Sequence, residues 1–334
     1  MTKYLNLQLF ADTYPNLNTN TTGTDTLSAE NKEFYDKNLI RLAKPNLIHD
    51  QFAQKRPIPK RGGKTIEFRQ FASLQKSLTP LTEGVTPKGN KLDVKKKTAT
   101  VSQYGDYVTM SDVLDLTAID PIVVEATEVI GNQAGLTLDT ITRDIVAAGS
   151  NVYYCPKKDG TEVLDRDSLD DTCTLTVDVI KRVAALLKAV NTPKIDGSYI
   201  GIVHPYVAYD IMSDPAWISV NQYADATKIF EGEVGKIGSV RFIETSEAKT
   251  FGDVYATLIF GANAYGVTEI EGGGLQTIVK QLGSAGTGDP LDQRSSVGWK
   301  AIKTAERLVE AYLVRVESKS ALGKDTLTND GWEN

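Results

Sequence analysis

The chain has 334 residues, of which 41% are hydrophobic and 24% charged, and its formal net charge is −6. This is the composition of a globular protein that can bury a core in one elaborated domain or two modest ones. The acidic balance argues against a surface built throughout to bind DNA or an anionic membrane. The sequence has neither an apolar run of bilayer-spanning length nor a hydrophobic signal core, so we expect a soluble protein made in the cytoplasm.

The cysteine supply is small. Cys155 and Cys173 are the two cysteines, and they form no Cys-x-x-Cys pattern. Their simplest interpretation is a pair of reduced structural thiols.

Residues 1–54 are predicted to form an N-terminal arm. Asn16 to Thr26 consists almost entirely of Asn, Thr, Gly and Asp, which is typical of a segment without a core. A short helix is expected to begin after Ser28, a candidate N-cap, and to end at Pro45.

The next segment, Lys55 to Lys97, carries a concentrated positive charge. It holds twelve basic against three acidic residues, a net charge of +9, so the rest of the chain carries −15. Period-two alternation over 64–71 and again over 99–104, with Pro and Gly between, predicts a two-stranded excursion over residues 55–100. It has too few apolar residues to fold alone and must lie on another surface.

A basic segment on an acidic body is suited to lying across an acidic copy of the same protein. We therefore predict that its cations lie at subunit contacts. The candidate residues are Lys55, Arg56, Lys60, Arg61, Lys64, Arg69, Lys95, Lys96 and Lys97. A merely solvated basic face and a nucleic-acid surface remain alternatives, although no helix-turn-helix, zinc or RNA-recognition motif surrounds the segment.

A long amphipathic helix is predicted over residues 121–148. Asp120 is a candidate N-cap, Pro121 suits the first helical position, and Gly149 ends the pattern. One apolar stripe recurs every three or four residues, so the helix is expected to brace a sheet. The stripe consists of Ile122, Ala126, Ile130, Ala134, Leu138, Ile141 and Ile145.

The remaining chain alternates between helical and strand patterns. Helices are expected over 177–190 and 206–212, and strands over 199–203, 240–243, 256–260 and 311–316. This order favours an α+β fold with a mixed sheet over repeated βαβ winding.

Motifs that carry chemistry are scarce. His49 and His204 are the only histidines, and no Ser or Cys motif accompanies His204. The acidic group Asp165, Asp167, Asp170 and Asp171 departs from the EF-hand pattern and is interpreted as a solvated loop rather than a calcium site. The glycines 232, 235 and 238 and the run 272–274 match no nucleotide-binding motif. No catalytic, metal or cofactor residue is predicted.

Several segments together resemble a known family. Residues 80–87 read PLTEGVTP, residues 101–112 read VSQYGDYVTMSD, and residues 289–300 read DPLDQRSSVGWK. These segments, with the opening LNLQLFA at 5–11, resemble major capsid proteins of tailed bacteriophages, specifically the branch related to the coat protein of phage N4.

The resemblance implies the Hong Kong 97 type fold, with an arm, an extended loop, a peripheral domain with a spine helix, and an axial domain. On this basis we divide the chain into an arm at 1–54, the extended loop at 55–100, and the peripheral domain with its spine at 101–150. The axial domain is expected at 151–260. The remaining axial and peripheral strands and a C-terminal tail are expected at 261–334.

The function implied by this resemblance is structural. The subunit is expected to form pentamers and hexamers of an icosahedral virion shell, assembled in the host bacterial cytoplasm. The shell would enclose double-stranded DNA without sequence specificity and without a membrane, aided by portal and scaffold proteins. An encapsulin-like compartment is an alternative within the same fold. A soluble α/β oxidoreductase is an alternative from another class, but it would need a nucleotide-binding turn that the sequence lacks.

Overall fold

A computed structural model gives the fold. It describes residues 47–71, 74–81, 83–86, 89–117, 122–218, 235–281, 284 and 289–323. The predicted arm helix, Asp120, Pro121 and Gly232 lie outside these residues. The chain divides into two units, one built from 1–47, 103–138 and 272–302, the other from 48–102, 139–271 and 303–334.

The first unit pairs long strands beside a helix. Strand β12 (Gln276–Lys280) runs antiparallel to the first part of β13 (Arg294–Arg307), and β4 (Ser102–Ser111) also pairs with β13. Helix α2 (Asp112–Thr117) follows β4, and α3 (Ile122–Ala147) begins in this unit. Trp299 of β13 is buried, and its indole Nε1 donates to Oε1 of Gln133 on α3 at 3.3 Å.

Helix α3 confirms the predicted long helix within one residue at each end. Ile130, Ala134 and Leu138 of the predicted stripe are buried. Farther along the helix, Ile141 and Ile145 are only half-buried. The buried positions there are Asp139, Thr142, Val146 and Ala147. The buried face at this end of α3 is therefore shifted from the centre of the predicted stripe, because Asp139 and Thr142 bond to His49 and Asp50 and because Val146 and Ala147 join an apolar core.

The second unit contains a mixed sheet. Its strand order is β5-β14-β10-β6-β8-β7, with β9 pairing β10. Strand β10 is antiparallel to β14 and β6, whereas β6–β8 and β14–β5 are parallel. The strands are β5 (Val152–Tyr154), β6 (Tyr199–Val203), β7 (Lys236–Ile237), β8 (Val240–Glu244), β9 (Thr250–Phe251), β10 (Val254–Phe260) and β14 (Leu313–Ser318).

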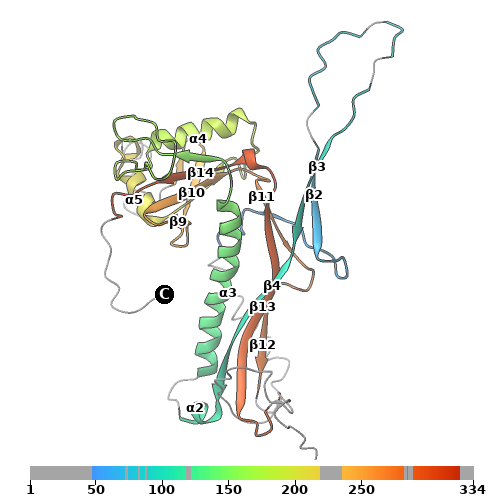
Figure 1. Cartoon of the computed structure of the whole chain (residues 1–334), viewed down its shortest axis with the longest axis vertical. Coiled ribbons are helices and arrows are strands. Elements are labelled where there is room, and N and C mark those ends of the chain that lie inside the picture. Colours follow the sequence, from blue (N-terminus) through green and yellow to red (C-terminus); the bar gives the residue numbers. More distant parts are fainter. Residues whose placement is uncertain are drawn as a thin grey trace, which may run out of the picture. The chain divides into compact units, whose positions relative to one another are not determined.

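Helices cover this sheet, and Figure 1 shows α4 and α5 beside its strands. Helix α4 (Val177–Ala189) is capped by Thr176, whose side chain accepts from the Val179 amide. Helix α5 (Pro205–Ser213) has His204 as its N-cap. The apolar faces of α4 and α5 form the larger hydrophobic core together with residues of strands β6, β7, β8, β10 and β14. Residues of β6, β10 and β14 form a second core with the end of α3. Each fully buried aliphatic side chain stabilises the fold by about 1.5–3 kcal/mol.

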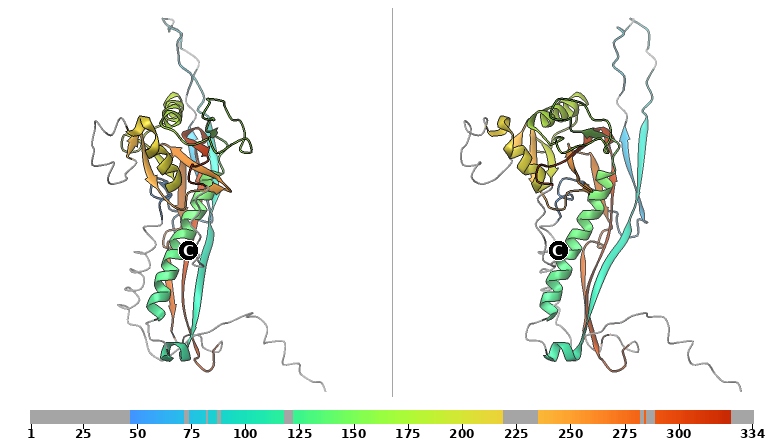
Figure 2. Two further views of the ribbon diagram at one scale, coloured as in Figure 1. Left: turned by 90° about the vertical axis from the view of Figure 1, so that its left-hand side faces the viewer. Right: turned by 60° about the vertical axis from the view of Figure 1, so that its left-hand side comes forward.

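The same unit holds the basic segment. Strand β1 (Gln54–Lys55) runs parallel to β11 (Tyr265–Glu269), which pairs antiparallel with the second half of β13. Strands β2 (Thr65–Phe71) and β3 (Val94–Thr100) form the predicted hairpin, and Figure 2 shows it continuing into a long extended loop. A 3-10 turn, η4 (Glu310–Tyr312), precedes β14.

The predicted fold class is confirmed, because mixed sheets and separate helices make an α+β protein. Every helix and strand predicted between residues 177 and 260 is present, with bounds shifted by a few residues. None of the helices within the described ranges combines the length and the apolar character that a bilayer-spanning helix needs.

Candidate assembly surface

Strands β2 and β3 bring like charges together on one face of the hairpin. Arg69 lies directly opposite Lys96, an arrangement that is destabilising without a counter-ion. Glu67 supplies one, since its Oε2 lies 3.1 Å from Nη2 of Arg69 and 3.7 Å from Nζ of Lys96. The hydrogen bond from Arg69 and the nearby charge of Lys96 lower the pKa of Glu67. This carboxylate therefore stays ionised and holds the two cations in place.

The other face of the hairpin is anchored on the body of the unit. Phe68 is only 6% exposed, and it lies against Gly266 of β11. A Cβ at position 266 would lie 3.1 Å from the Phe68 ring, so the glycine permits this close approach. Ala99 of β3 is buried as well. On the same hairpin, Nζ of Lys97 lies 3.9 Å from Oε1 of Glu306.

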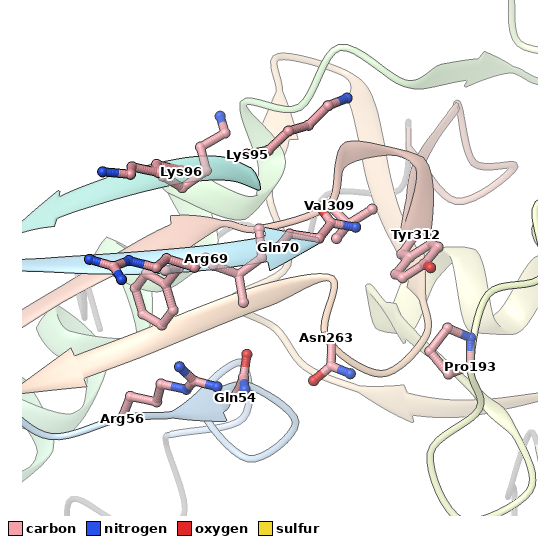
Figure 3. A pocket seen from close by; sticks show the side chains of 13 residues that line it. Gln54, Arg56, Arg69, Gln70, Lys95, Lys96, Pro193, Asn263, Val309 and Tyr312 are labelled. Atoms are coloured by element: carbon pink, nitrogen blue, oxygen red, sulfur yellow. The ribbon is translucent and has the colours of Figure 1, made fainter. Parts of the chain in front are cut away.

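A groove of about 660 Å³ opens beside this anchored hairpin. Figure 3 shows hairpin residues such as Arg69 and Lys95 on one side and Asn263, Tyr312 and Pro193 on the other. The cations that line it are Arg56, Arg69, Lys95, Lys96 and Lys97. The apolar and aromatic lining comes from Phe68, Pro193, Leu308, Val309 and Tyr312.

The chemistry of this groove is that of binding. The described residues that line it include no carboxylate, histidine, cysteine or serine, and its polar side-chain groups are the five cations, the amides of Gln54, Gln70 and Asn263 and the Tyr312 hydroxyl. Five cations around an apolar wall suit an acidic protein surface that carries an exposed apolar side chain.

The structure places all nine predicted interface cations on the surface. It brings five of them together at the groove, as named above. Lys55, Lys60, Arg61 and Lys64 are exposed but do not line it. Their place at a subunit contact stays a prediction.

The loop beyond the hairpin exposes apolar side chains. Leu78 and Leu81 are among the most exposed large hydrophobic residues of the described chain, and Val85 and Leu92 are also exposed. Such a collection on an extended loop marks a surface that another molecule covers. The charge of this segment predicts a subunit contact, and these exposed apolar residues are a second signal for such a contact.

The apolar wall of the groove was not predicted from the sequence. Pro193 follows α4, Asn263 precedes β11, and Leu308 to Tyr312 connect β13 to β14. The amide of Ala262 donates to the carbonyl of Pro193 at 2.8 Å, which joins two of these turns. Residues so far apart in sequence carry no local pattern that would predict a common wall.

The other candidate residues have structural partners. Nδ1 of His49 lies 2.6 Å from Oδ2 of Asp139 in the interior. Nδ1 of His204 accepts from the Tyr206 amide at 3.2 Å and caps α5. Gly235 and Gly272 have positive φ values of 71° and 78°, as turn glycines do.

The acidic loop is held by hydrogen bonds and ion pairs. Asp165 accepts from the Ser168 amide, and Oδ2 of Asp170 lies 2.8 Å from Nζ of Lys157. Within the described ranges, no group of three or more His, Cys, Asp or Glu side chains is arranged to hold a metal ion. Cys155 and Cys173 are buried free thiols, and burial raises the pKa of Cys155.

Comparison with known proteins identifies the fold. A family model described as "Phage capsid protein" matches residues 123–288. No curated protein matches the sequence significantly. The capsid structure of cyanophage P-SCSP1u is similar with a TM-score of 0.64 and 13% identity, covering 94% of each chain.

Two further solved phage capsid structures are similar to this chain. The capsid of Ralstonia phage GP4 has a TM-score of 0.64 and 16% identity, covering 85% of this chain and 89% of its own. The cyanophage Pam1 capsid has a TM-score of 0.61 and 13% identity, covering 95% and 100%. The predicted α+β fold of the Hong Kong 97 type is confirmed over most of the chain.

Proposed function

We propose, from the premise that this chain is a phage capsid protein with a structural and non-enzymatic role in the virion, that it is the major subunit of an icosahedral shell. In this proposal, copies assemble into pentamers and hexamers that enclose double-stranded DNA. The observation that carries the proposal is the β2–β3 hairpin, which presents clustered cations and an exposed apolar loop on a chain that is otherwise acidic.

Charge supports contact between copies more than contact with the genome. The segment from Lys55 to Lys97 carries +9, whereas the rest of the chain carries −15. A neighbouring copy therefore offers abundant carboxylates. Individual exposed ion pairs contribute only about 0–1 kcal/mol, so many of them must act together.

The finer assignment to the branch related to the phage N4 coat protein is supported by residues 289–300. In the first unit, Asp289, Val297 and Trp299 of this segment are buried, and Nε of Arg294 lies 4.0 Å from Oδ1 of Asp289. The assignment to this branch rests on the sequence resemblance of this segment, whose side chains are packed in the first unit. Portal and scaffold proteins are proposed as further partners from the same resemblance.

The test is a charge reversal within the groove. Changing Lys95, Lys96 and Lys97 to Glu should abolish or strongly reduce shell formation and leave the folded subunit intact. Electron microscopy would score the shells, and far-UV circular dichroism would score the fold. The matched control changes the exposed residues Lys181, Lys188 and Lys236 to Glu, which alters the net charge equally. Normal shell yields from the groove variant would contradict the proposed use of this surface.

A further inference from the structure

A single leucine protrudes from the acidic loop between β5 and α4. Leu164 is 84% exposed, although its neighbour Val163 and the nearby Leu169 are buried. A leucine held outward between buried anchors exposes apolar area at a fixed position. A single exposed leucine is ordinary on a protein surface, so what distinguishes Leu164 is how firmly its loop is held and which charges surround it.

The loop around Leu164 is held by strong contacts. Arg166 binds the buried Glu317 with two hydrogen bonds of 2.7 Å, and its guanidinium lies 3.7 Å from the centre of the Phe251 ring. Such bidentate pairing fixes geometry as well as charge. The loop therefore presents Leu164 as a preformed projection, which lowers the entropic cost of binding.

Carboxylates surround this projection. Glu162, Asp165 and Asp167 are exposed on either side of Leu164. The positive charge of Arg166 between them is already paired with Glu317. The loop thus offers one apolar side chain within an acidic rim.

We propose that Leu164 of one subunit inserts into the groove beside the β2–β3 hairpin of a second copy. The groove has the complementary chemistry, with an apolar wall that includes Val309 and Tyr312 and a rim that includes Lys95, Lys96 and Lys97. The acidic residues beside Leu164 then face these lysines. This inference rests on the proposed function and names a specific contact through which copies associate.

The contact joins two different surfaces of the same chain. An interface of this heterologous kind propagates from copy to copy and closes into a ring when the rotation permits. Pentamers and hexamers are rings of that type. The projection and the groove therefore supply a directional link that a self-complementary patch would not.

Cysteine pairing tests the contact directly. In a chain with Leu164→Cys and Val309→Cys, mild oxidation of assembled shells should produce subunit multimers on a non-reducing gel. The native thiols Cys155 and Cys173 are buried. The matched control combines Val309→Cys with Leu186→Cys, another exposed leucine of the same unit, and should give monomers. A disulfide forms only when the two Cα atoms come within about 7 Å.

A charge exchange tests the rim without cysteine chemistry. Changing Glu162, Asp165 and Asp167 to Lys should raise the protein concentration needed for assembly at least ~10-fold. Combining this change with Lys95, Lys96 and Lys97 to Glu should restore most of the loss, because the rims again have opposite charges.

The outcomes separate the contact from the function. Shells that form without the 164–309 crosslink, and charge changes that do not compensate, would overturn the contact and leave the shell function standing. If another segment of the chain or a scaffold protein covered the groove in the shell, the 164–309 crosslink would also be absent. That outcome would likewise overturn the contact and leave the shell function standing. Failure of the unmodified chain to assemble would overturn both.

Discussion

His49 has a structural role that its isolated position in the sequence did not indicate. Asp139 of α3 accepts from both the backbone amide of His49, at 2.8 Å, and its ring. Nearby, Nζ of Lys303 donates to Asp50 at 2.5 Å, and Thr142 donates to the same carboxylate at 2.7 Å. These polar contacts fasten the segment before β1 to the end of α3 within the second unit.

Replacing Asp139, which accepts both hydrogen bonds from His49, should lower the free energy of unfolding. Asp139→Ala leaves the buried donors of His49 without their acceptor, and each buried donor left unsatisfied costs about 1–3 kcal/mol. Urea unfolding of unassembled subunits should show a loss of that size in the free energy of unfolding. Asp165→Ala, on the exposed loop, should cost less than about 1 kcal/mol. Equal losses in the two variants would contradict the network.

His204 makes stability depend on pH. Burial lowers its pKa below 6.5, and its ring packs between Tyr206 and Tyr255. The unfolded chain then takes up a proton at higher pH than the folded chain, so stability falls as the pH drops below about 6.5. Protonation of Nδ1 would also break the cap on α5.

Substitution by asparagine isolates this effect. His204→Asn replaces the Nδ1 acceptor with a side-chain oxygen that can cap the helix, and it removes the titration. Between pH 7.5 and 5.5, the free energy of unfolding should fall less in the variant than in the unmodified chain. An identical fall in both would show that His204 does not contribute to the pH dependence.

At the scale of elements, amphipathic patterns located the helices well. Helix α4 and strands β6 and β10 bury continuous or periodic apolar residues, so their positions could be read from local sequence. Strand β13 could not, because it includes Lys300, Lys303, Thr304 and Glu306. Its formation depends on long-range pairing with β11 and β12. The β-propensity of individual residues does not reveal such long-range strand pairing.

Helix α3 provides a test between adjacent residues. Ile130 is 2% exposed, whereas Val129 is 66% exposed. Ile130→Asp buries an unpaired charge and should cost several kcal/mol, about enough to unfold the subunit. Val129→Asp should change the free energy of unfolding by less than about 1 kcal/mol. Soluble, assembling protein from Ile130→Asp would mean that the buried face has been assigned wrongly.

The assembly surface shows a limit of sequence reasoning. The charge run at 95–97 and the hairpin were predictable, because the period-two pattern and turn residues are local. The groove was not, since its wall combines turns near Pro193, Asn263 and Tyr312. The exposure of Leu164 was also not predictable, because the sequence does not show that Val163 and Leu169 are buried while Leu164 is not. A linear pattern does not reveal which apolar residues remain exposed.

At the scale of the whole molecule, net charge predicts how the proposed shell would hold DNA. A chain of net charge −6 should hold a genome by enclosure, because a strongly basic lining would trap DNA through counter-ion release. Unassembled subunits should bind duplex DNA no more tightly than about 10 μM at physiological salt, within the range of non-specific binding. Fluorescence anisotropy with two unrelated duplexes would measure this. A sub-micromolar, sequence-selective complex would contradict the account.

The central claim is that copies of this chain build a closed shell. The most direct measurement is the mass and shape of the purified, assembled protein, by sedimentation velocity and electron microscopy of the same sample. A subunit of 36.4 kDa in an icosahedral shell of at least about 60 copies gives a particle on the order of 2 MDa or more. We predict uniform, hollow, closed particles in that mass range. A monomer or small oligomer as the sole species, under conditions where the subunit is folded, would contradict the account.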